Sequence, residues 1–219
     1  MKTLKTILIA TTFAANANAS IISLGGDAAG LYTSAPASFK LGQYEHNTHT
    51  RVHLESIGLP ILPGTKYDAH NPGHYGSGKG KPSGGTIPTY PWTWANSYLF
   101  HFDPTSGVPT KESQGWAIFD APIYVLSSNE NIDNTDTYYG YKIAGLYPGF
   151  LSDRGYDMLT NDEYTISNPT PTTWRIDFHA WASTGMDQLR IIETPGVPAP
   201  GAAGLLAAGA LLAARRRRR

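Results

Sequence analysis

The chain has no cysteine among its 219 residues, and only 16% of them are charged. Without cysteine it cannot form disulfides, use a thiol nucleophile, or hold an iron–sulfur cluster or a thiolate-bound zinc ion. Its core, or a bound metal, must therefore stabilise it. A long helical pattern is also lacking, because no window of about 12 or more residues between Ser20 and Pro195 carries an apolar stripe at helical spacing.

The charges are unevenly distributed along the chain. Seven of the 17 basic residues lie at its two ends: Lys2, Lys5, Arg215, Arg216, Arg217, Arg218 and Arg219. The other 10 basic residues and all 17 acidic residues lie in the body between Asp27 and Glu193, which therefore carries a charge of about −7. An acidic body is not typical of a nucleic-acid-binding protein, and we expect no nucleic-acid partner.

The chain instead contains 23 Gly, 16 Pro, 13 Tyr and 5 Trp residues, which favour turns and strands. Apolar and polar residues alternate at the strand period in four windows: Arg51–Glu55, Ser97–Asp103, Thr172–Ala182 and Asp187–Thr194. The stretch Trp116–Leu126 is more continuously apolar and is a candidate central strand, interrupted by Pro122. We therefore predict an all-β fold, an antiparallel two-sheet sandwich or jelly-roll-like domain over residues 20–195.

The N-terminal segment, residues 1–19, has the features of a secretory signal peptide. Lys2 and Lys5 precede a short apolar stretch, and the small residues Ala17 and Ala19 form a cleavage site before Ser20. We expect export through the Sec machinery and removal of this segment by signal peptidase.

The C-terminal segment, residues 196–219, admits three interpretations: a membrane anchor, a basic tail for nucleic acid, or a sorting signal. Fourteen consecutive Gly, Ala and Leu residues (201–214) would make about 21 Å of helix, short of the roughly 30 Å of a hydrocarbon core. They form a marginal span, and the arginines after it would stay in the cytoplasm, with the body outside. An acidic body on the far side of the membrane excludes the nucleic-acid tail, and the weak span disfavours a permanent anchor.

This segment resembles the sorting signal of bacterial PEP-CTERM proteins, the substrates of exosortases. That signal combines a Pro-Glu-Pro motif, a short apolar helix and a terminal Arg cluster, which here correspond to residues Val197, Pro198, Ala199 and Pro200, the transmembrane helix 201–214 and the five arginines from Arg215 to Arg219. Ala199 stands where the family usually has Glu. The resemblance implies transient anchoring in the inner membrane, processing by an exosortase, and transfer to the cell surface or exopolysaccharide matrix.

The body also resembles a β-rich class of ectodomains among these proteins. The similar phrases are "SYLFHFDP" from Ser97, "WAIFDAPIYVL" from Trp116 and "GMDQLRIIE" from Gly185. No activity is defined for that class, so this resemblance implies a fold and not a reaction.

The sequence offers few residues for chemistry. No G-x-S-x-G, H-E-x-x-H or S-x-x-K motif stands in a credible context, and we expect no catalytic residues and no enzyme activity, with a secreted hydrolase as the remote alternative. Glu130, Asp133 and Asp136 could bind calcium, with a plain solvated turn as the favoured alternative. His46 and His49 could meet His70 and His74 in a loop metal site, with ordinary surface histidines as the alternative.

Aromatic residues suggest a carbohydrate-binding module as the alternative function. Tyr90, Trp92 and Trp94 alternate with other residues, so that on a strand all three would line one face. If exposed, that face would stack on sugars of an exopolysaccharide; if turned inward, it would belong to the core of the sandwich.

Overall fold

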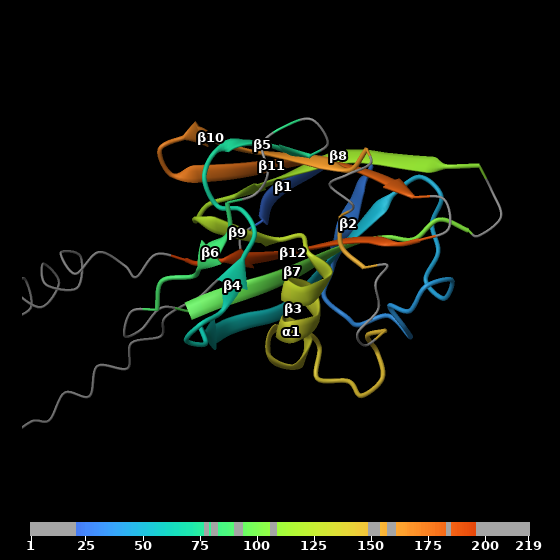
Figure 1. The fold of residues 1–219 in the computed structure, drawn as a ribbon, viewed down its shortest axis with the longest axis horizontal. Helices are drawn as coiled ribbons and strands as arrows, with labels where there is room; N and C mark the ends of the chain where they lie inside the picture. Colours follow the sequence, from blue (N-terminus) through green and yellow to red (C-terminus); the bar gives the residue numbers. More distant parts are fainter. Residues whose placement is uncertain are drawn as a thin grey trace, which may run out of the picture.

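Two five-stranded sheets pack face to face in the computed structural model, which describes residues 21–76, 79, 83–89, 94–105, 109–148, 154–156, 161–182 and 185–195 (Figure 1). Sheet A has the order β1 (Ile21–Gly26), β8 (Lys111–Phe119), β11 (Thr173–Ala182), β10 (Glu163–Thr170) and β5 (Gly73–Gly76). Sheet B has the order β2 (Ala28–Tyr32), β3 (Thr50–Pro60), β7 (Trp94–Phe102), β12 (Asp187–Glu193) and β9 (Ile123–Leu126).

The remaining elements are a small pair of strands, β4 (Lys66–Tyr67) with β6 (Gly85–Thr86), and one helix, α1 (Asn129–Tyr139). Among the strand pairs in the described part of the chain, β2 and β3 run parallel and the others antiparallel. The predicted all-β, two-sheet fold is confirmed for these residues.

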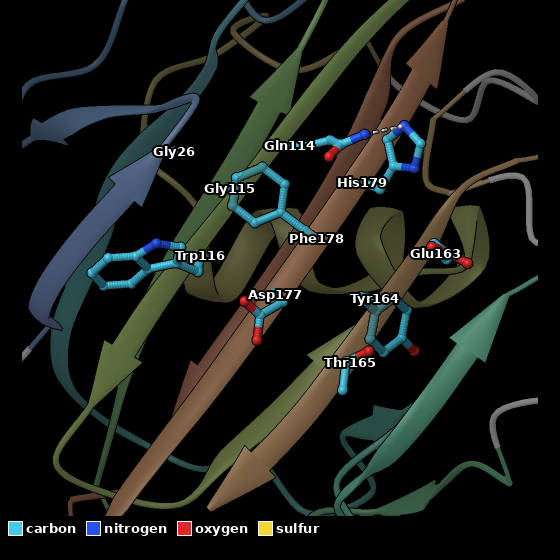
Figure 2. Close-up of a pocket in the computed structure, with 10 residues that line it drawn as sticks. All are labelled: Gly26, Gln114, Gly115, Trp116, Glu163, Tyr164, Thr165, Asp177, Phe178 and His179. Carbon is cyan, nitrogen blue, oxygen red and sulfur yellow. Dashed lines mark hydrogen bonds between the residues drawn. The ribbon is translucent and has the colours of Figure 1, made fainter. Parts of the chain in front are cut away.

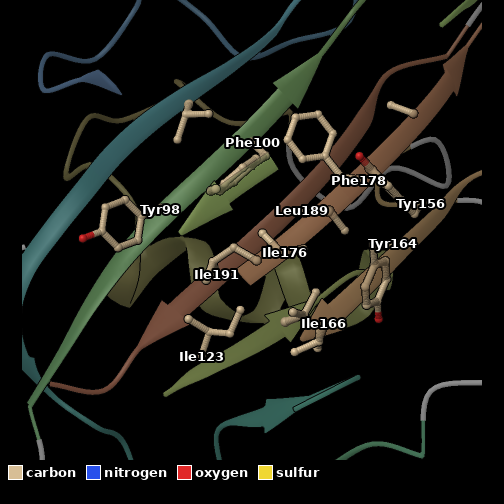
Figure 3. Packing of buried hydrophobic residues seen from close by; sticks show 14 of the residues in the cluster. Tyr98, Phe100, Ile123, Tyr156, Tyr164, Ile166, Ile176, Phe178, Leu189 and Ile191 are labelled. Atoms are coloured by element: carbon tan, nitrogen blue, oxygen red, sulfur yellow. The ribbon is translucent and has the colours of Figure 1, made fainter. Parts of the chain in front are cut away.

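The main core lies between the two sheets and follows from strand alternation. On β11, Ile176 and Phe178 are buried, while Asp177 between them is half-buried on the outer face, as the sequence pattern predicts. From sheet B, the ring of Phe100 meets the ring of Phe178 edge-on, with 5.5 Å between their centroids. Figure 3 shows these side chains interdigitating with Tyr98 and the isoleucines of both sheets.

The outer face of sheet B is covered as well. Leu99 and His101 of β7 point away from the main core, yet only 0% and 1% of their surface is exposed. Leu99 packs with Phe39 and Leu146 from two loops, and α1 lies across β12 and β3 (Figure 1). The middle strands of sheet B, β7 and β12, are therefore covered on both faces, whereas the outer face of sheet A meets solvent.

The prediction of one central strand over Trp116–Leu126 is wrong. β8 ends at Phe119 in sheet A, and β9 begins at Ile123 in sheet B. Pro122 between them has no backbone N–H and cannot continue a ladder, but its carbonyl accepts a hydrogen bond from Thr194 N at 2.9 Å. The continuous apolar run therefore covers the end of one strand, β8, and the whole of the next, β9. The two strands lie in different sheets, and both contribute residues to the core.

The segment interpreted as an acidic turn is the helix α1. Ser128 caps its N-terminus by accepting from Asn131 N at 3.4 Å, and Asp68 accepts from the backbone of Ser127 and Ser128 at 2.6 and 2.8 Å. The buried positions follow the helical period: Ile132, Thr135, Asp136 and Tyr139. Hydropathy cannot reveal this face, because two of the four residues are polar.

The predicted signal peptide with its cleavage residues Ala17, Ala19 and Ser20 lies outside the described residues, and so does the predicted sorting segment 196–219. In the part of the chain that the structure describes, no helix has the length and apolarity of a membrane span.

Candidate functional site

A groove of about 350 Å³ runs over the outer face of sheet A (Figure 2). Strand register places its residues in two rows. Trp116 of β8 lies opposite Asp177 of β11, which lies opposite Thr165 of β10. In the neighbouring row, Gln114, His179 and Glu163 are aligned in the same way. The volume lies within the range of small-molecule pockets in proteins.

Trp116 forms the aromatic side of the groove, and Gly25 gives its indole room. A Cβ atom on Gly25 would collide with the indole ring, so the side chain can lean over β1 only because that position is glycine (Figure 2). A Cβ atom on Gly26 would meet the backbone of Gln114 and Gly115 instead, and Gly26 has φ +67°. The surface of the groove beside the indole is therefore formed by the backbone of glycine residues, Gly26 and Gly115.

Arg175 contacts the residues on this side of the groove. Its guanidinium carbon lies 4.8 Å from the centroid of the Trp116 ring, a cation–π distance, and its Nε donates to Asp177 Oδ2 at 2.9 Å. The bond to Asp177 raises the pKa of Arg175, which therefore stays charged. Arg175 thus connects Trp116 and Asp177, the two residues that line this side of the groove.

The other side of the groove carries amide, imidazole and carboxylate groups. Gln114 Nε2 lies 3.3 Å from His179 Nε2, which lies 3.2 Å from Glu112 Oε2. On the next strands, His74 Nε2 lies 2.9 Å from Glu163 Oε2. Such groups donate to and accept from hydroxyls, while an indole face contacts apolar C–H surface. This combination suits a polyhydroxylated ligand with an apolar face.

The aromatic platform proposed from the sequence is only partly described. Trp94 begins β7 in sheet B with 40% of its surface exposed, whereas Tyr90 and Trp92 lie outside the described residues. Trp94 is thus not turned into the core, but it belongs to the sheet opposite the groove. Sequence reasoning missed Trp116, because it assigned that residue to a continuously apolar strand.

The calcium candidates lie on α1 and not in an open loop. Asp133 and Asp136, one helical turn apart, both accept hydrogen bonds from Arg154 Nη1. Burial raises the pKa of Asp133, and Arg154 opposes that rise. Glu130 lies in the first turn of the helix, where its charge suits the helix dipole. Among the described residues, no three His, Cys, Asp or Glu side chains are grouped to hold a metal ion.

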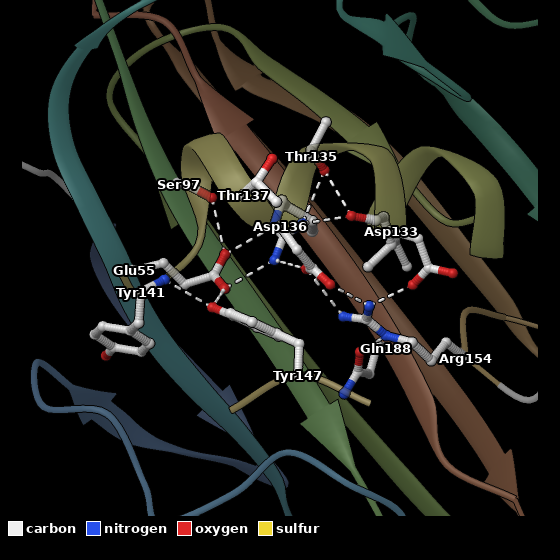
Figure 4. Close-up of polar contacts among 12 residues, drawn as sticks. Glu55, Ser97, Asp133, Thr135, Asp136, Thr137, Tyr141, Tyr147, Arg154 and Gln188 are labelled. Carbon is white, nitrogen blue, oxygen red and sulfur yellow. Dashed lines mark hydrogen bonds and ion pairs between the residues drawn. The ribbon is translucent and has the colours of Figure 1, made fainter. Parts of the chain in front are cut away.

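Two arginines at this helix, Arg154 and Arg190, belong to a buried charge cluster. Figure 4 shows Arg154 of this cluster together with Asp133 and Asp136. Arg190 of β12 pairs with Glu55 of β3 and, through Nη2, with Asp136 Oδ1 at 2.8 Å. Arg154 Nε donates to Gln188 Oε1 at 2.7 Å. Both arginine side chains have 0% of their surface exposed. These contacts hold α1 against sheet B. The charged groups of the cluster bind one another.

A larger cleft of about 580 Å³ lies beside this cluster at the C-terminal end of α1. Its ionic groups are already engaged: Lys142 Nζ donates to the carbonyls of Thr137 and Tyr138, and the carboxylates bind Arg154. We therefore regard this cleft as part of the structural cluster and the groove on sheet A as the candidate site.

The histidines do not come together as a metal site. His46 and His49 contact each other, with ring centroids 4.7 Å apart, whereas His70 is stacked between Tyr124 and Trp174. His74 pairs with Glu163 on the rim of the groove. His46 and His49 thus lie together, whereas His70 and His74 each contact other groups elsewhere in the fold.

Two other histidines are buried beneath the loop that carries Phe39. Burial lowers the pKa of His53 to about 4 and that of His101 to about 3. The ring of Phe39 contacts both edge-on, at centroid distances of 5.0 and 5.3 Å. Both imidazoles are therefore neutral in the folded protein at neutral pH.

Comparison of the chain with protein-family models, with curated proteins and with solved structures gives no match.

Proposed function

We propose that the chain is an exported, non-enzymatic protein of the cell surface or exopolysaccharide matrix, and that its body binds polysaccharide through the groove on sheet A. In this proposal, signal peptidase removes residues 1–19, the short helix 201–214 holds the protein in the inner membrane, and an exosortase cleaves near Pro198-Ala199-Pro200. The body is then released outward as a β-sandwich of the jelly-roll kind.

The sorting part of the proposal is supported by two independent signals in the sequence. The N-terminal segment directs the body outward, and the arginines after residue 214 keep the C-terminal end in the cytoplasm. Both signals place the acidic body on the outer side of the membrane. The weak apolarity of the Ala- and Gly-rich helix suits a temporary hold.

The binding part of the proposal rests on one observation: Trp116 lies at one side of a solvent-facing groove whose other side carries Gln114, His179 and Glu163. An indole with adjacent hydrogen-bonding groups can contact both the apolar face and the hydroxyls of a sugar ring. A protein destined for a polysaccharide matrix would meet that ligand at high local concentration.

The sorting proposal is tested by determining the C-terminus of the mature protein together with its cellular fraction. We expect a secreted or surface-bound form that lacks Arg215–Arg219, and we expect these arginines only on a membrane-bound precursor. A secreted protein that retains all five arginines would overturn the proposal.

The binding proposal is tested by sedimentation with insoluble exopolysaccharide from the cells that make the protein. Trp116→Ala should weaken binding about tenfold, because losing the contact surface of an indole costs about 1.5 kcal/mol. Trp94→Ala is the matched control, an exposed tryptophan on the other sheet. If Trp94→Ala abolished binding and Trp116→Ala did not, the site would lie at residues 90–94 and not in the groove.

A further inference from the structure

The described chain leaves the sandwich at one defined end. The last residue of β12, Glu193, pairs with Asn96 of β7 and with Ile123 of β9. Thr194 N then donates to Pro122 O at 2.9 Å, which ties the exit to the connection between the two sheets. Residue 195, the last described residue, therefore lies at the end of the sandwich where β7 and β9 begin.

The described chain also enters the sandwich at this end. Ile21, the first residue of β1, pairs with Phe119, the last residue of β8. Phe119 is separated by only three residues from Ile123, which pairs with Glu193. Both terminal segments thus extend from the same end of the domain, which we call the exit end.

A short leash connects the exit end to the apolar helix. Five residues, 196–200, separate Pro195 from Gly201. At roughly 3.4 Å per residue, the six steps reach at most about 20 Å. The polar headgroup layer takes up about 5–7 Å of this distance. The remaining gap is smaller than the radius of gyration of a domain of this size, about 16 Å. The exit end must therefore face the bilayer whenever the helix is inserted.

Exposed apolar side chains are found at the exit end. Trp94, which pairs with Pro60, has 40% of its surface exposed, and Ile57 has 52%. A bulge in β3 produces the exposure of Ile57, because Ser56 pairs with Ser97 while Leu59 pairs with Ala95.

The bulge has a defined conformation. Gly58 adopts φ +61°, and its N–H donates to Asn96 Oδ1 at 3.0 Å. On sheet A, Ile22 at the start of β1 is 54% exposed at the same end. The exit end therefore presents aliphatic and indole surface in a fixed arrangement.

We propose that the exit end rests on the outer surface of the inner membrane while the helix 201–214 holds the chain, with Trp94 and Ile57 in contact with phospholipid. This inference depends on the membrane-held stage of the proposed function. Tryptophan and aliphatic side chains favour the boundary between headgroups and acyl chains. Few residues take part, so the contact depends on the high effective concentration that the leash imposes, and it is lost when the leash is cut.

The absence of cysteine allows this contact to be measured with single-cysteine variants of the full chain after signal removal. Ile57→Cys places a fluorescent label at the exit end, and Thr110→Cys places one at the opposite end, next to Lys111, where β8 begins. Both positions are exposed, so that the labels should leave the fold intact. The protein is inserted into phosphatidylcholine–phosphatidylglycerol vesicles with or without a brominated phospholipid as quencher.

We expect the brominated lipid to quench the label at position 57 at least threefold more than the label at position 110. A chain that ends at Pro195 should not float with the vesicles. Equal quenching at the two positions in protein that floats with the vesicles would overturn the proposed orientation and leave the sorting proposal intact. Failure of the full chain to float would overturn both proposals, and flotation of the chain ending at Pro195 would overturn the role of the leash.

Discussion

Arg190 binds both carboxylate oxygens of Glu55, with Nε 2.8 Å from Oε2 and Nη2 2.9 Å from Oε1. The two side chains come from β12 and β3, the strands on either side of β7, and neither has exposed surface. The other nitrogen, Nη1, donates to Ile132 O of α1 at 2.7 Å. One guanidinium thus connects two strands and the helix that covers them.

We expect Arg190→Met to destabilise the protein by about 3–5 kcal/mol, because Glu55 would remain buried without a cation and Asp136 would keep only Arg154 as its partner cation. Urea unfolding followed by circular dichroism measures this loss. Arg175→Met is the matched control: the Arg175–Asp177 pair is about one-third exposed on the arginine side, and breaking it should cost at most about 1 kcal/mol. An equal loss of unfolding free energy in the two variants would show that the buried cluster stabilises the protein no more than the exposed ion pair does.

Stability should also fall in mild acid. His53 and His101 have folded-state pKa values of about 4 and 3, below their ordinary value of 6.5, so below that pH the unfolded chain binds protons that the folded chain does not. Asp103 acts in the opposite direction, because burial raises its folded-state pKa to about 6. Two histidines outweigh one carboxyl group, and stability should be on the order of 3 kcal/mol lower at pH 4.5 than at pH 7.

The comparison of urea midpoints at the two pH values checks this expectation. His53→Phe should reduce the difference, since the ring stacked on Tyr32 at 5.1 Å is kept but cannot be protonated. His49→Gln, at an exposed position, should leave the difference unchanged. A wild-type midpoint that is the same at both pH values would contradict the buried, neutral state of the two histidines.

The strands of the core could be predicted from the sequence, and the covering layer could not. Residues Thr173–Ala182 alternate cleanly because one face meets the core and the other meets solvent. All seven residues of β12 are buried, so alternation gives no sign of which face is which. Arg190 and Glu55 lie 135 positions apart, and a local pattern cannot reveal such a pair.

The groove illustrates the same limit. The sequence pattern correctly turns Asp177 and His179 outward, but Trp116 becomes part of a site only through its neighbours on other strands. Gly25, which leaves room for the indole, belongs to β1 at the other end of the sheet order from β5. Pairing between strands that are distant in sequence therefore creates the site.

We expect Gly25→Val to weaken polysaccharide binding without unfolding the protein. A side chain at this position meets the indole of Trp116, which can move, and no backbone atom is among its nearest contacts. Binding should fall about as far as in Trp116→Ala, while the thermal midpoint should change by only a few degrees. Gly30→Val, where a Cβ would have no neighbour within 4 Å but φ is +47°, controls for backbone strain. Binding equal to wild type in Gly25→Val would show that the indole position is unimportant.

Calcium should not stabilise the protein through Asp133 and Asp136. Both carboxylates already bind the guanidinium of Arg154, so a cation would have to replace an existing buried ion pair. Thermal unfolding should give the same midpoint in millimolar calcium and in a chelator. A midpoint that rises with calcium, and that no longer does so in Asp133→Asn, would establish a calcium site on α1.

In the proposed sorting segment, Ala199 stands where the Pro-Glu-Pro motif of the family that it resembles has Glu. If the motif is read by an exosortase, Ala199→Glu restores the Pro-Glu-Pro form and should raise the fraction of protein that is processed and leaves the membrane. Val197→Glu introduces the same charge two residues earlier, outside the Pro-x-Pro motif, and should not have this effect. Pulse–chase labelling with separation of membrane and extracellular fractions measures both variants. An equal gain from the two would mean that the negative charge near the membrane surface, and not the motif, controls release.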